Sequence, residues 1–419
     1  MHPLTKKLFS TIKANSLGME TPIEKIRSGT LKLYALEQEM PAAEAVSLRR
    51  EYIEKETDSE LKSIGNYTIP EDYAVKHNIE NMIGCIQIPV GAAGPLSVRG
   101  EYADGSFYIP LATTEGALIA SINRGCRAVS AAGGAEARVF SDGMTRAPVF
   151  AAESISHAAE AARWIEDNFP LIKEAAEATT SHGKLIRISV FTAGCSVYVR
   201  MVYNTGLSMG MNMATIASAA AEKVIAEHTG LRPVASSGNL CCDKKPAAVN
   251  LIEGRGKTVS AGVFLTDEIL NTILKTDAHS FFEVNLRKNM EGSARAASLG
   301  FNAHAANVIA ALFIATGQDP AHVVEGSSCM TTAELRDGGV YVSVTIPALQ
   351  IGVLGGGTVL PCQHEAISLL KCDKGLDSDA KKFAEIAASA VLAGEISLIS
   401  ALAAGTLASS HKKLARGHA

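Results

Sequence analysis

Hydrophobic and polar residues change their spacing along this chain, and each change predicts a different kind of element. Over residues 1–80, apolar positions recur at helical spacing among many charges, and Pro41 suits the first turn of a helix. We therefore expect a helical N-terminal segment there. From residue 81 the pattern becomes apolar runs punctuated by glycine and proline, and PVGAAGP at 89–95 is typical of a tight loop.

The segment 147–235 has a pattern of its own. Ser154 can cap a helix that runs to Asn168, because the proline that soon follows disfavours its continuation. Two runs of alternating apolar residues, 184–191 and 196–203, predict antiparallel strands joined by a short turn.

A long alanine-rich helix is predicted after this hairpin, from Gly210 to Gly230, and a short strand follows at 232–235. The segment is thus an α+β pattern that resembles a small ferredoxin-like unit. It is inserted in a larger mixed α/β domain, which we expect residues 81–146 and 236–411 to form.

Composition and charge narrow the class of protein. The chain has 419 residues, 47% hydrophobic and 20% charged, which excludes wholesale disorder. Its net charge of −4 gives no general attraction to nucleic acid or to an anionic membrane, and we expect neither partner. The eight cysteines form no CxxC pair and no cluster with zinc spacing, so we expect neither a disulfide framework nor a metal site.

No targeting or membrane segment is predicted. The first residues have too short an apolar run for a signal sequence. The longest apolar candidate, 387–410, carries Glu395 and is predicted to be a packed helix. We therefore expect a cytoplasmic protein, with a flexible tail at 412–419.

Two charged positions suggest chemistry. Glu115 stands in LATTEGAL, where desolvation would raise its pKa and make it a proton donor near neutrality. The alternative is a carboxylate that accepts hydrogen bonds at a helix start. Lys244 follows Asp243 beside small residues, where an ammonium group can stabilise an oxyanion and the aspartate can orient it. The alternative is a solvated run of charges.

Other candidates lie at helix ends and in glycine-rich loops. His304 and Asn307 are expected on one face at the start of an apolar helix, and Asp319 follows its end, where a turn-forming aspartate is common. The loop 352–358 can bring backbone N–H groups against an anion. His411 follows a long helix, where an imidazole on a mobile tail can deliver a proton.

Eight motifs, taken together, resemble one family, class I 3-hydroxy-3-methylglutaryl-coenzyme A (HMG-CoA) reductase, in a form without a membrane anchor. They occur in the family's order between about Tyr34 and His411. The motifs are ENMIG (80–84), PVGAAGPL (89–96), ATTEG (112–116), SDGMTR (141–146), MGMNM (209–213), DKKPAA (243–248), FNAHAAN (301–307) and GQD (317–319).

This resemblance implies an NAD(P)H-dependent oxidoreductase that reduces (S)-HMG-CoA to (R)-mevalonate and CoA by two hydride transfers, for isoprenoid biosynthesis. It also implies a homodimer or homotetramer whose active site lies at a subunit interface. The large domain would dimerise and bind substrate, and the inserted domain would bind the nicotinamide cofactor. Two alternatives remain open: the same catalyst preferring NAD and degrading mevalonate, and a non-catalytic cofactor-binding scaffold.

The resemblance assigns roles residue by residue. Lys244 would stabilise the oxyanion, Glu115 would protonate the carbonyl oxygen, and Asp319 would hold their network, while His411 would protonate the leaving CoA thiolate. The positions that grip the hydroxymethylglutaryl group are Arg146, Ser237, Asp243, Lys245 and Asn307. Those that face CoA are Tyr34, Ser121, Asn123, Arg124 and Arg127. The cofactor positions are Ser181, His182, Lys184, Met209, Gly210, Met211, Asn212, Gly355, Gly356 and Gly357.

Two departures from the family concern the cofactor. Leu207 and Ser208 precede Met209 where the family has Asp-Ala, and Ser181 stands near the place of an arginine that faces the 2′-phosphate of NADPH. Losing that arginine removes a charge-assisted hydrogen bond worth about 1.5–3 kcal/mol. Because His182 or Lys184 can compensate, we favour NADP(H) narrowly over NAD(H).

Overall fold

The computed structural model describes residues 21–405 and divides into two compact units, one ending at Gln87 and the other beginning at Ile88. The N-terminal unit is helical, as the sequence predicted. Pro41 occupies the N-cap of its longest helix. The helices are α2 (Pro22–Arg27), η1 (Leu33–Ala35), α3 (Leu36–Glu39), α4 (Ala42–Thr57) and α5 (Glu71–His77).

A buried arginine joins the parts of this N-terminal unit. Arg49 of α4 is 1% exposed. Its guanidinium donates to the backbone oxygens of Leu33 and Met82 and to the carboxylate of Glu37, all within 3.1 Å. The charge is therefore paired and its donors are satisfied, as burial requires.

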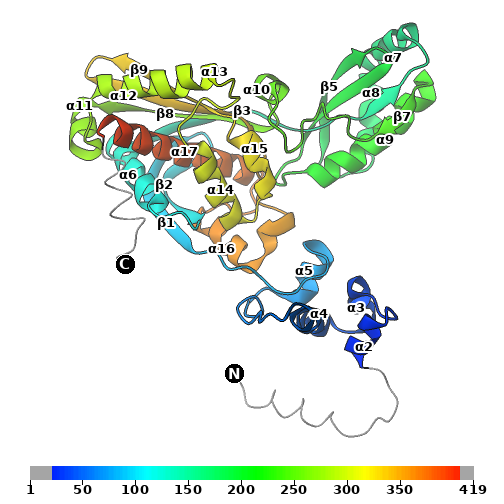
Figure 1. The fold of residues 1–419 in the computed structure, drawn as a ribbon. Coiled ribbons are helices and arrows are strands. Elements are labelled where there is room, and N and C mark those ends of the chain that lie inside the picture. The colour runs from blue at the N-terminus through cyan, green and yellow to red at the C-terminus, as the bar shows by residue number, and fades with distance from the viewer. Residues whose placement is uncertain (1–20, 406–419) are drawn as a thin grey trace. The chain divides into compact units, whose positions relative to one another are not determined.

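The second unit is built on one mixed sheet (Figure 1). Its main part has the order β2-β1-β3-β8-β10-β9, in which only β1 and β3 run parallel. The last residues of β3, Met144–Arg146, pair instead with β6 (Ser196–Asn204), which belongs to the inserted module at residues 147–235. β3 therefore belongs both to the main part of the sheet and to the strands of the inserted module. The strands are β1 (Val90–Gly100), β2 (Asp104–Ala112), β3 (Ala135–Arg146), β8 (Gly256–Thr266), β9 (Met330–Arg336) and β10 (Gly339–Leu349).

The prediction of a loop at 89–95 is wrong, because most of this stretch lies in β1. Val90 to Ala93 pair with Ala112 to Ile109 of β2, and the irregularity is confined to a bulge between Ala93 and Leu96. Gly94, at φ 130°, and Pro95 occupy that bulge. A neighbouring strand supplies hydrogen-bond partners that the local glycine and proline pattern does not reveal.

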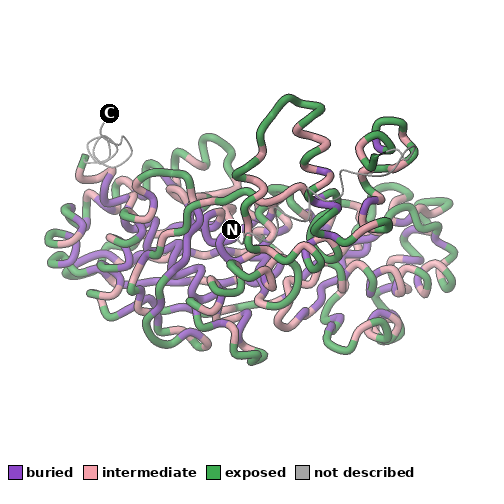
Figure 2. Tube along the Cα trace, turned by 90° about the horizontal axis from the view of Figure 1, so that it is seen from below, coloured by how far each residue is buried: buried purple, intermediate pink, exposed green. Residues whose placement is uncertain are grey.

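The helix α17 (Asp379–Ala403) is the centre of the large domain's core. It is long and apolar enough to cross a membrane, but 83% of its most apolar window is buried, as in the core helix of a globular protein. The predicted packed helix is thus confirmed as far as residue 403. Buried Glu395 accepts hydrogen bonds from the Ala303 and His304 amides and from the Thr331 hydroxyl. In Figure 2, the residues that are buried, including those of this core, are coloured purple.

The other helices of this domain pack around the sheet and α17. At the crossing of α6 and α17, a Cβ on Gly125 would collide with the backbone carbonyl of Ala393, so glycine allows the close approach. These helices are α6 (Leu118–Ala131), α10 (Ala248–Glu253), α11 (Asp267–Ile269), η2 (Leu270–Leu274), α12 (Ala278–Val284), η3 (Asn285–Gly292), α13 (Ser293–Arg295), α14 (Ala305–Thr316), η4 (Pro320–His322), α15 (Val323–Gly326), η5 (Gly356–Val359) and α16 (Pro361–Leu369).

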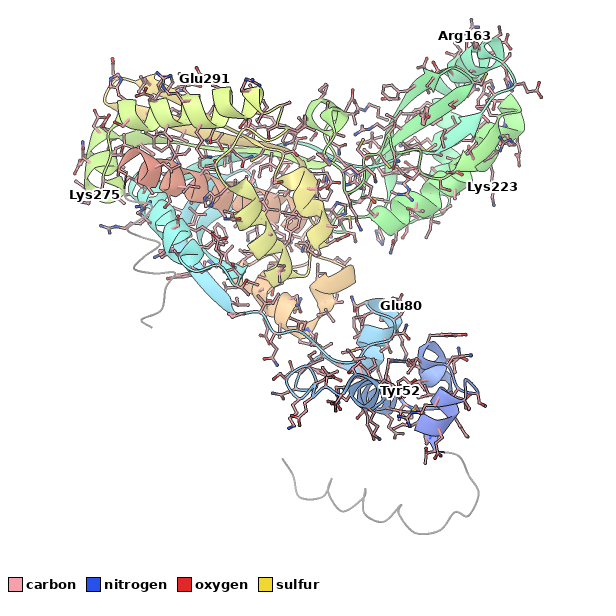
Figure 3. The ribbon with its side chains drawn as sticks, viewed as in Figure 1. Tyr52, Glu80, Arg163, Lys223, Lys275 and Glu291 are labelled. Atoms are coloured by element: carbon pink, nitrogen blue, oxygen red, sulfur yellow. The ribbon has the colours of Figure 1, made fainter. Side chains whose placement is uncertain are left out.

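The inserted module has its own hydrophobic core and the five elements that the sequence predicted, together with two that it did not predict, β4 and α8. The Ser154 hydroxyl caps α7, and Gly210 and Gly230 bound α9. Arg163 of α7 and Lys223 of α9 lie on its exposed surface (Figure 3). The elements are β4 (Val149–Ala151), α7 (Ile155–Asp167), α8 (Phe169–Glu177), β5 (Lys184–Ala193), β6 (Ser196–Asn204), α9 (Met211–Thr229) and β7 (Arg232–Ala235).

Candidate active site

The loop between β7 and α10 carries Lys244 in an unusual backbone conformation. Asn239, Cys242 and Lys244 have φ values of 63°, 49° and 57°. This left-handed region costs a non-glycine residue roughly 1–2 kcal/mol. Such strain persists only where the surroundings hold the backbone in place, and it is concentrated at functional sites.

Side chains from three other elements hold this loop by its carbonyl groups. Buried Arg200 of β6 donates to the Leu240 oxygen at 3.1 Å. The Thr145 hydroxyl donates to the Cys241 oxygen at 3.2 Å, and the Asn250 amide donates to the Cys242 oxygen at 3.1 Å. The loop is therefore anchored to both the inserted module and the large domain.

Lys244 and Asp319 form an ion pair, with 2.8 Å between Nζ and Oδ2. The hydrogen bond with Asp319 raises the pKa of Lys244, outweighing the opposing effect of burial. Burial would raise the pKa of Asp319, but the hydrogen bonds from Lys244 and the Ala321 amide lower it overall. Both groups therefore stay charged around neutrality. Asp319 also caps η4 through the Ala321 amide at 3.0 Å, so it is a turn former as well.

A buried layer of charge lies against this pair. Arg255 is 0% exposed and donates to Asp243 Oδ1 at 2.9 Å and to Glu325 Oε1 at 3.1 Å. The same Glu325 oxygen accepts the backbone N–H of Lys244 at 2.6 Å. This contact stabilises the left-handed backbone at Lys244.

Asp243, His322 and Glu325 also place three potential metal-ligand atoms within 4.8 Å of one another. The Arg255 guanidinium, however, already pairs with oxygens of both carboxylates. A fixed positive charge at that position opposes a metal cation. We therefore assign this cluster to ion pairing.

Glu115 lies on the loop between β2 and α6, and the Asn307 amide donates to its Oε1 at 3.4 Å. The apolar surroundings predicted for Glu115 are absent from the described residues, because its side chain is exposed. Its backbone N–H donates to the Thr113 hydroxyl at 2.9 Å. Among residues 21–405, no hydrogen bond or ion pair joins Glu115 to Lys244.

The prediction that His304 and Asn307 share one face of a helix is wrong. His304 precedes α14 at the N-cap position, with φ −160° and ψ 32°, so the helical spacing rule does not reach it. Its Nε2 instead lies 2.8 Å from the Gly394 carbonyl oxygen of α17. His304 therefore has a structural role here.

Four of the candidate substrate-binding residues, Arg146, Ser237, Asp243 and Lys245, lie on or beside the Lys244 loop, whereas Asn307 lies beside Glu115. The Gly238 amide donates to the Ala147 oxygen at 2.6 Å, which sets Ser237 beside the end of β3 and Arg146. The Arg146 Nε is buried without a hydrogen-bond partner among the described residues. A guanidinium with a free donor suits a carboxylate. Lys245 is exposed, and its Nζ lies 3.1 Å from the Asp243 carbonyl oxygen.

Three of the predicted CoA positions on α6 are engaged within the chain. Ser121 and Arg124 hydrogen-bond to Ser397 of α17, and burial lowers the pKa of Arg124. Asn123 accepts the Gly94 amide at 3.0 Å. Arg127 is exposed and has no such partner among the described residues, which leaves it free for a ligand. Tyr34, in the N-terminal unit, is 71% exposed.

Two of the predicted cofactor segments meet at the start of α9. The Val353 amide donates to the Leu207 oxygen at 2.8 Å, and Ser208 bridges to Leu354. Gly210 caps α9 without a side-chain hydrogen bond to its first amides. Gly355 and Gly356 have positive φ and open space where a Cβ would point. Free amides at a helix start and an accessible glycine backbone fit a pyrophosphate.

The third cofactor segment is the loop between α8 and β5, which carries Ser181 and His182 on its exposed side. A Cβ on Gly183 of this loop would collide with the sulfur of Met213, so the loop packs on the first turns of α9. Lys184 Nζ lies 3.3 Å from Glu177 Oε2. Its charge is therefore already shared with a carboxylate.

The buried residues Arg255, His322 and Glu325 were not predicted from the sequence. Asp319, His322 and Glu325 are three residues apart across η4 and α15, and residues at that spacing lie over one another in a 3₁₀ turn. This DxxHxxE spacing is a signal that could have found two of the three residues. Arg255, between two glycines, offered no comparable pattern.

Comparison with known proteins supports the resemblance. A family profile described as "Hydroxymethylglutaryl-coenzyme A reductase" matches residues 45–416. The chain is 52% identical over 400 residues to a "3-hydroxy-3-methylglutaryl-coenzyme A reductase" of Methanocaldococcus jannaschii, covering 94% of this chain and 98% of that protein. It is 50% identical over 396 residues to the protein of the same name from Methanothermobacter thermautotrophicus, covering 94% and 99%.

A solved structure shares the fold. It is the class II 3-hydroxy-3-methylglutaryl-CoA reductase of Streptococcus pneumoniae bound to NADPH, with a TM-score of 0.65 and 18% identity. The match covers 88% of this chain and 97% of that one. At this identity the likeness concerns the fold alone, and it agrees with the mixed α/β architecture that the sequence predicted.

Proposed function

Since this chain belongs to the hydroxymethylglutaryl-coenzyme A reductase family and is an NAD(P)H-dependent oxidoreductase, we propose that it is a class I enzyme reducing (S)-HMG-CoA to (R)-mevalonate and CoA for isoprenoid biosynthesis. Identity near 50% with archaeal relatives, against 18% with a class II structure, supports the class. The observation that carries the proposal is the Lys244–Asp319 ion pair on a strained, anchored loop. No observation favours the oxidative or the non-catalytic alternative.

Lys244 is the oxyanion stabiliser in this proposal. Its ammonium group is charged at neutral pH and is held by Asp319, so it needs little reorganisation when negative charge develops on the carbonyl oxygen. Arg146, with a free buried donor, takes the carboxylate of the hydroxymethylglutaryl group, assisted by Ser237, Asp243, Lys245 and Asn307.

Glu115 supplies the proton to the carbonyl oxygen, with Asn307 orienting one of its carboxylate oxygens. A proton donor of this kind works best when it is desolvated, yet Glu115 is exposed in the single chain. We therefore propose that bound substrate and a second copy of the chain complete the site, in a homo-oligomer. His411, proposed to protonate the CoA thiolate, lies outside the described residues.

The nicotinamide cofactor, when bound, supplies the hydride. Met209 to Asn212 and Gly355 to Gly357 would hold its pyrophosphate through backbone amides, and the loop with Ser181, His182 and Lys184 would face a 2′-phosphate. We propose NADP(H) narrowly ahead of NAD(H).

Each proposed domain has its own role. Residues 147–235 form the cofactor domain, residues 81–146 and 236–411 form the substrate and dimerisation domain, and residues 1–80 form the N-terminal helical segment. Arg127 and the other α6 positions are the proposed CoA contacts of the second unit, and Tyr34 is the proposed CoA contact of the N-terminal unit. We propose a cytoplasmic location, without nucleic acid or membrane as partners.

The test is a steady-state assay of cofactor oxidation with HMG-CoA, with each cofactor in turn and mevalonate and CoA measured as products. Lys244→Ala should lower kcat at least about a hundredfold, the scale of a lost oxyanion stabiliser. Lys55→Ala is a matched control, because Lys55 is similarly exposed (49% against 45%) and is also in an ion pair, at 2.6 Å. Near-normal activity in folded Lys244→Ala protein would contradict the assignment.

A further inference from the structure

His322 occupies the centre of the charged layer around Lys244. It is 0% exposed and stands at the junction of η4 and α15. Its Nε2 lies 3.6 Å from Asp319 Oδ2, the same oxygen that pairs with Lys244, and 3.8 Å from Asp243 Oδ1. One buried ring therefore faces both carboxylates that flank the proposed oxyanion stabiliser.

The opposite side of the ring sets where its proton resides. Nδ1 lies 3.4 Å from Arg255 Nη1, and a guanidinium nitrogen can only donate. Nε2 faces oxygens of two carboxylates, Asp319 and Asp243, which can only accept, so a neutral ring carries its hydrogen on Nε2 and leaves Nδ1 to accept from Arg255. In a charged ring, whose Nδ1 faces Glu325 Oε1 at 3.5 Å, Nε2 carries a hydrogen as well. In either state, an N–H points toward Asp319 and Asp243.

This donor is unused in the described chain. Nε2 has no hydrogen-bond partner there, although it is fully buried. Leaving a buried donor unpaired costs free energy, and native proteins rarely tolerate it without a reason. The distance to Asp319 exceeds a typical hydrogen bond of about 2.9 Å by less than an ångström. Hydrogen bonds of an active site often tighten in this way when substrate binds.

We propose that His322 is a positioning residue for the reduction: its Nε2–H closes onto Asp319 in the substrate complex and fixes the carboxylate that orients Lys244. This inference rests on the proposed function. The three-residue spacing of Asp319, His322 and Glu325 allows it, because Glu325 holds the Lys244 backbone while His322 holds the partner of its side chain. His322 acts through Asp319 and does not itself touch the reacting atoms.

Two substitutions separate this role from simple filling of space. In His322→Gln the side-chain amide can reach the position of Nε2 and keep the donor, whereas in His322→Asn it reaches only that of Nδ1. We expect kcat to stay within about threefold of the parent for glutamine. For asparagine we expect a loss of about ten- to a hundredfold, the scale of a hydrogen bond to a charged group. The KM for the cofactor should change little in both, because the α9 and Gly355 segments are intact.

His157→Asn is the matched control. His157 Nε2 lies 2.7 Å from the Thr229 carbonyl oxygen in the inserted module, so this substitution removes an Nε2 contact away from Lys244. Thermal midpoints of all variants report whether each is folded. A folded His322→Asn protein with the parent's kcat, or a folded His322→Gln protein as impaired as asparagine, would overturn the proposal. An inactive parent would instead refute the proposed function.

A measurement on the parent protein decides the matter if His322→Asn does not fold. Nitrogen NMR of histidine-labelled protein should show a proton on Nε2 of His322, in a signal that His322→Gln lacks. Adding HMG-CoA should move that proton downfield as the bond to Asp319 shortens. A neutral ring protonated on Nδ1, or a signal unchanged by HMG-CoA in an active enzyme, would overturn the proposal.

Discussion

Replacing Ser181 with arginine should shift the enzyme toward NADPH. The loop that carries Ser181 packs on the first turns of α9, where we place the cofactor. Lys184, three residues after Ser181, has its Nζ 3.3 Å from Glu177 Oε2, and Glu177 also binds Lys173 at 2.7 Å. Two ammonium groups share one carboxylate, so the cluster keeps a net positive charge, but the Lys184 ammonium is held at Glu177 and must leave this ion pair to bind a 2′-phosphate directly.

The magnitude follows from exposure. A charge-assisted hydrogen bond contributes about 1.5–3 kcal/mol, and the exposed position of Ser181 favours the lower end, because solvent screens the charge. We expect Ser181→Arg to raise kcat/KM for NADPH by roughly tenfold, with little change for NADH. Glu177→Gln, which frees Lys184 from an exposed ion pair, should give a smaller gain of about 1.4- to fivefold.

The assay compares kcat/KM for both cofactors in the parent and the two variants, at low and high salt. Gains that arise from exposed charges should shrink at high salt. Ser156→Arg, which adds the same charge at an exposed position of α7, controls for net charge. A parent that already prefers NADPH by about a thousandfold, with no response to Ser181→Arg, would show that other residues recognise the phosphate.

Three further predictions concern other parts of the chain. His411→Gln should impair HMG-CoA reduction far more than reduction of free mevaldehyde, which has no thiolate to expel; equal losses in the two assays would assign His411 another role. Because the pKa of Asp319 is lowered by folding, its ionised carboxylate stabilises the protein above about pH 4 and loses this effect as pH falls through the lowered pKa. The thermal midpoints of the parent and Asp319→Asn should therefore converge in acid, and a constant gap would argue against it. Gly125→Val should lower stability by about 1–3 kcal/mol or more, since its side chain collides with the α17 backbone, and an unchanged denaturant midpoint would refute that reasoning.

Short-range signals in the sequence determined much of the secondary structure. The Ser154 cap, the hairpin of β5 and β6, and the glycines at both ends of α9 all lie where the pattern placed them. Each depends on hydrogen bonds or steric preferences within a few residues, so the local sequence contains the needed information. The eight ordered motifs are also short stretches of sequence, and they indicated the family without any knowledge of the geometry.

The predictions that were wrong concern residues whose conformation depends on a contact with a segment distant in the sequence. The stretch 89–95 resembles a loop until β2 supplies its hydrogen bonds. His304 resembles a helical neighbour of Asn307 until α17 provides the Gly394 carbonyl. In both cases local propensity was overridden by a tertiary contact.

For the active site too, some features could be predicted from the sequence and others only from the structure. Motifs alone indicated Lys244, Asp319 and Glu115 as reactive positions. Only the tertiary structure decided that Lys244 bonds to Asp319 and not to Glu115 within the described residues, and that Glu115 is exposed in the single chain. It also decided that buried Arg255, His322 and Glu325 lie against the Lys244–Asp319 pair. Burial and charge compensation depend on the groups that folding brings within a few ångströms, and the distances between those groups appear nowhere in the order of residues.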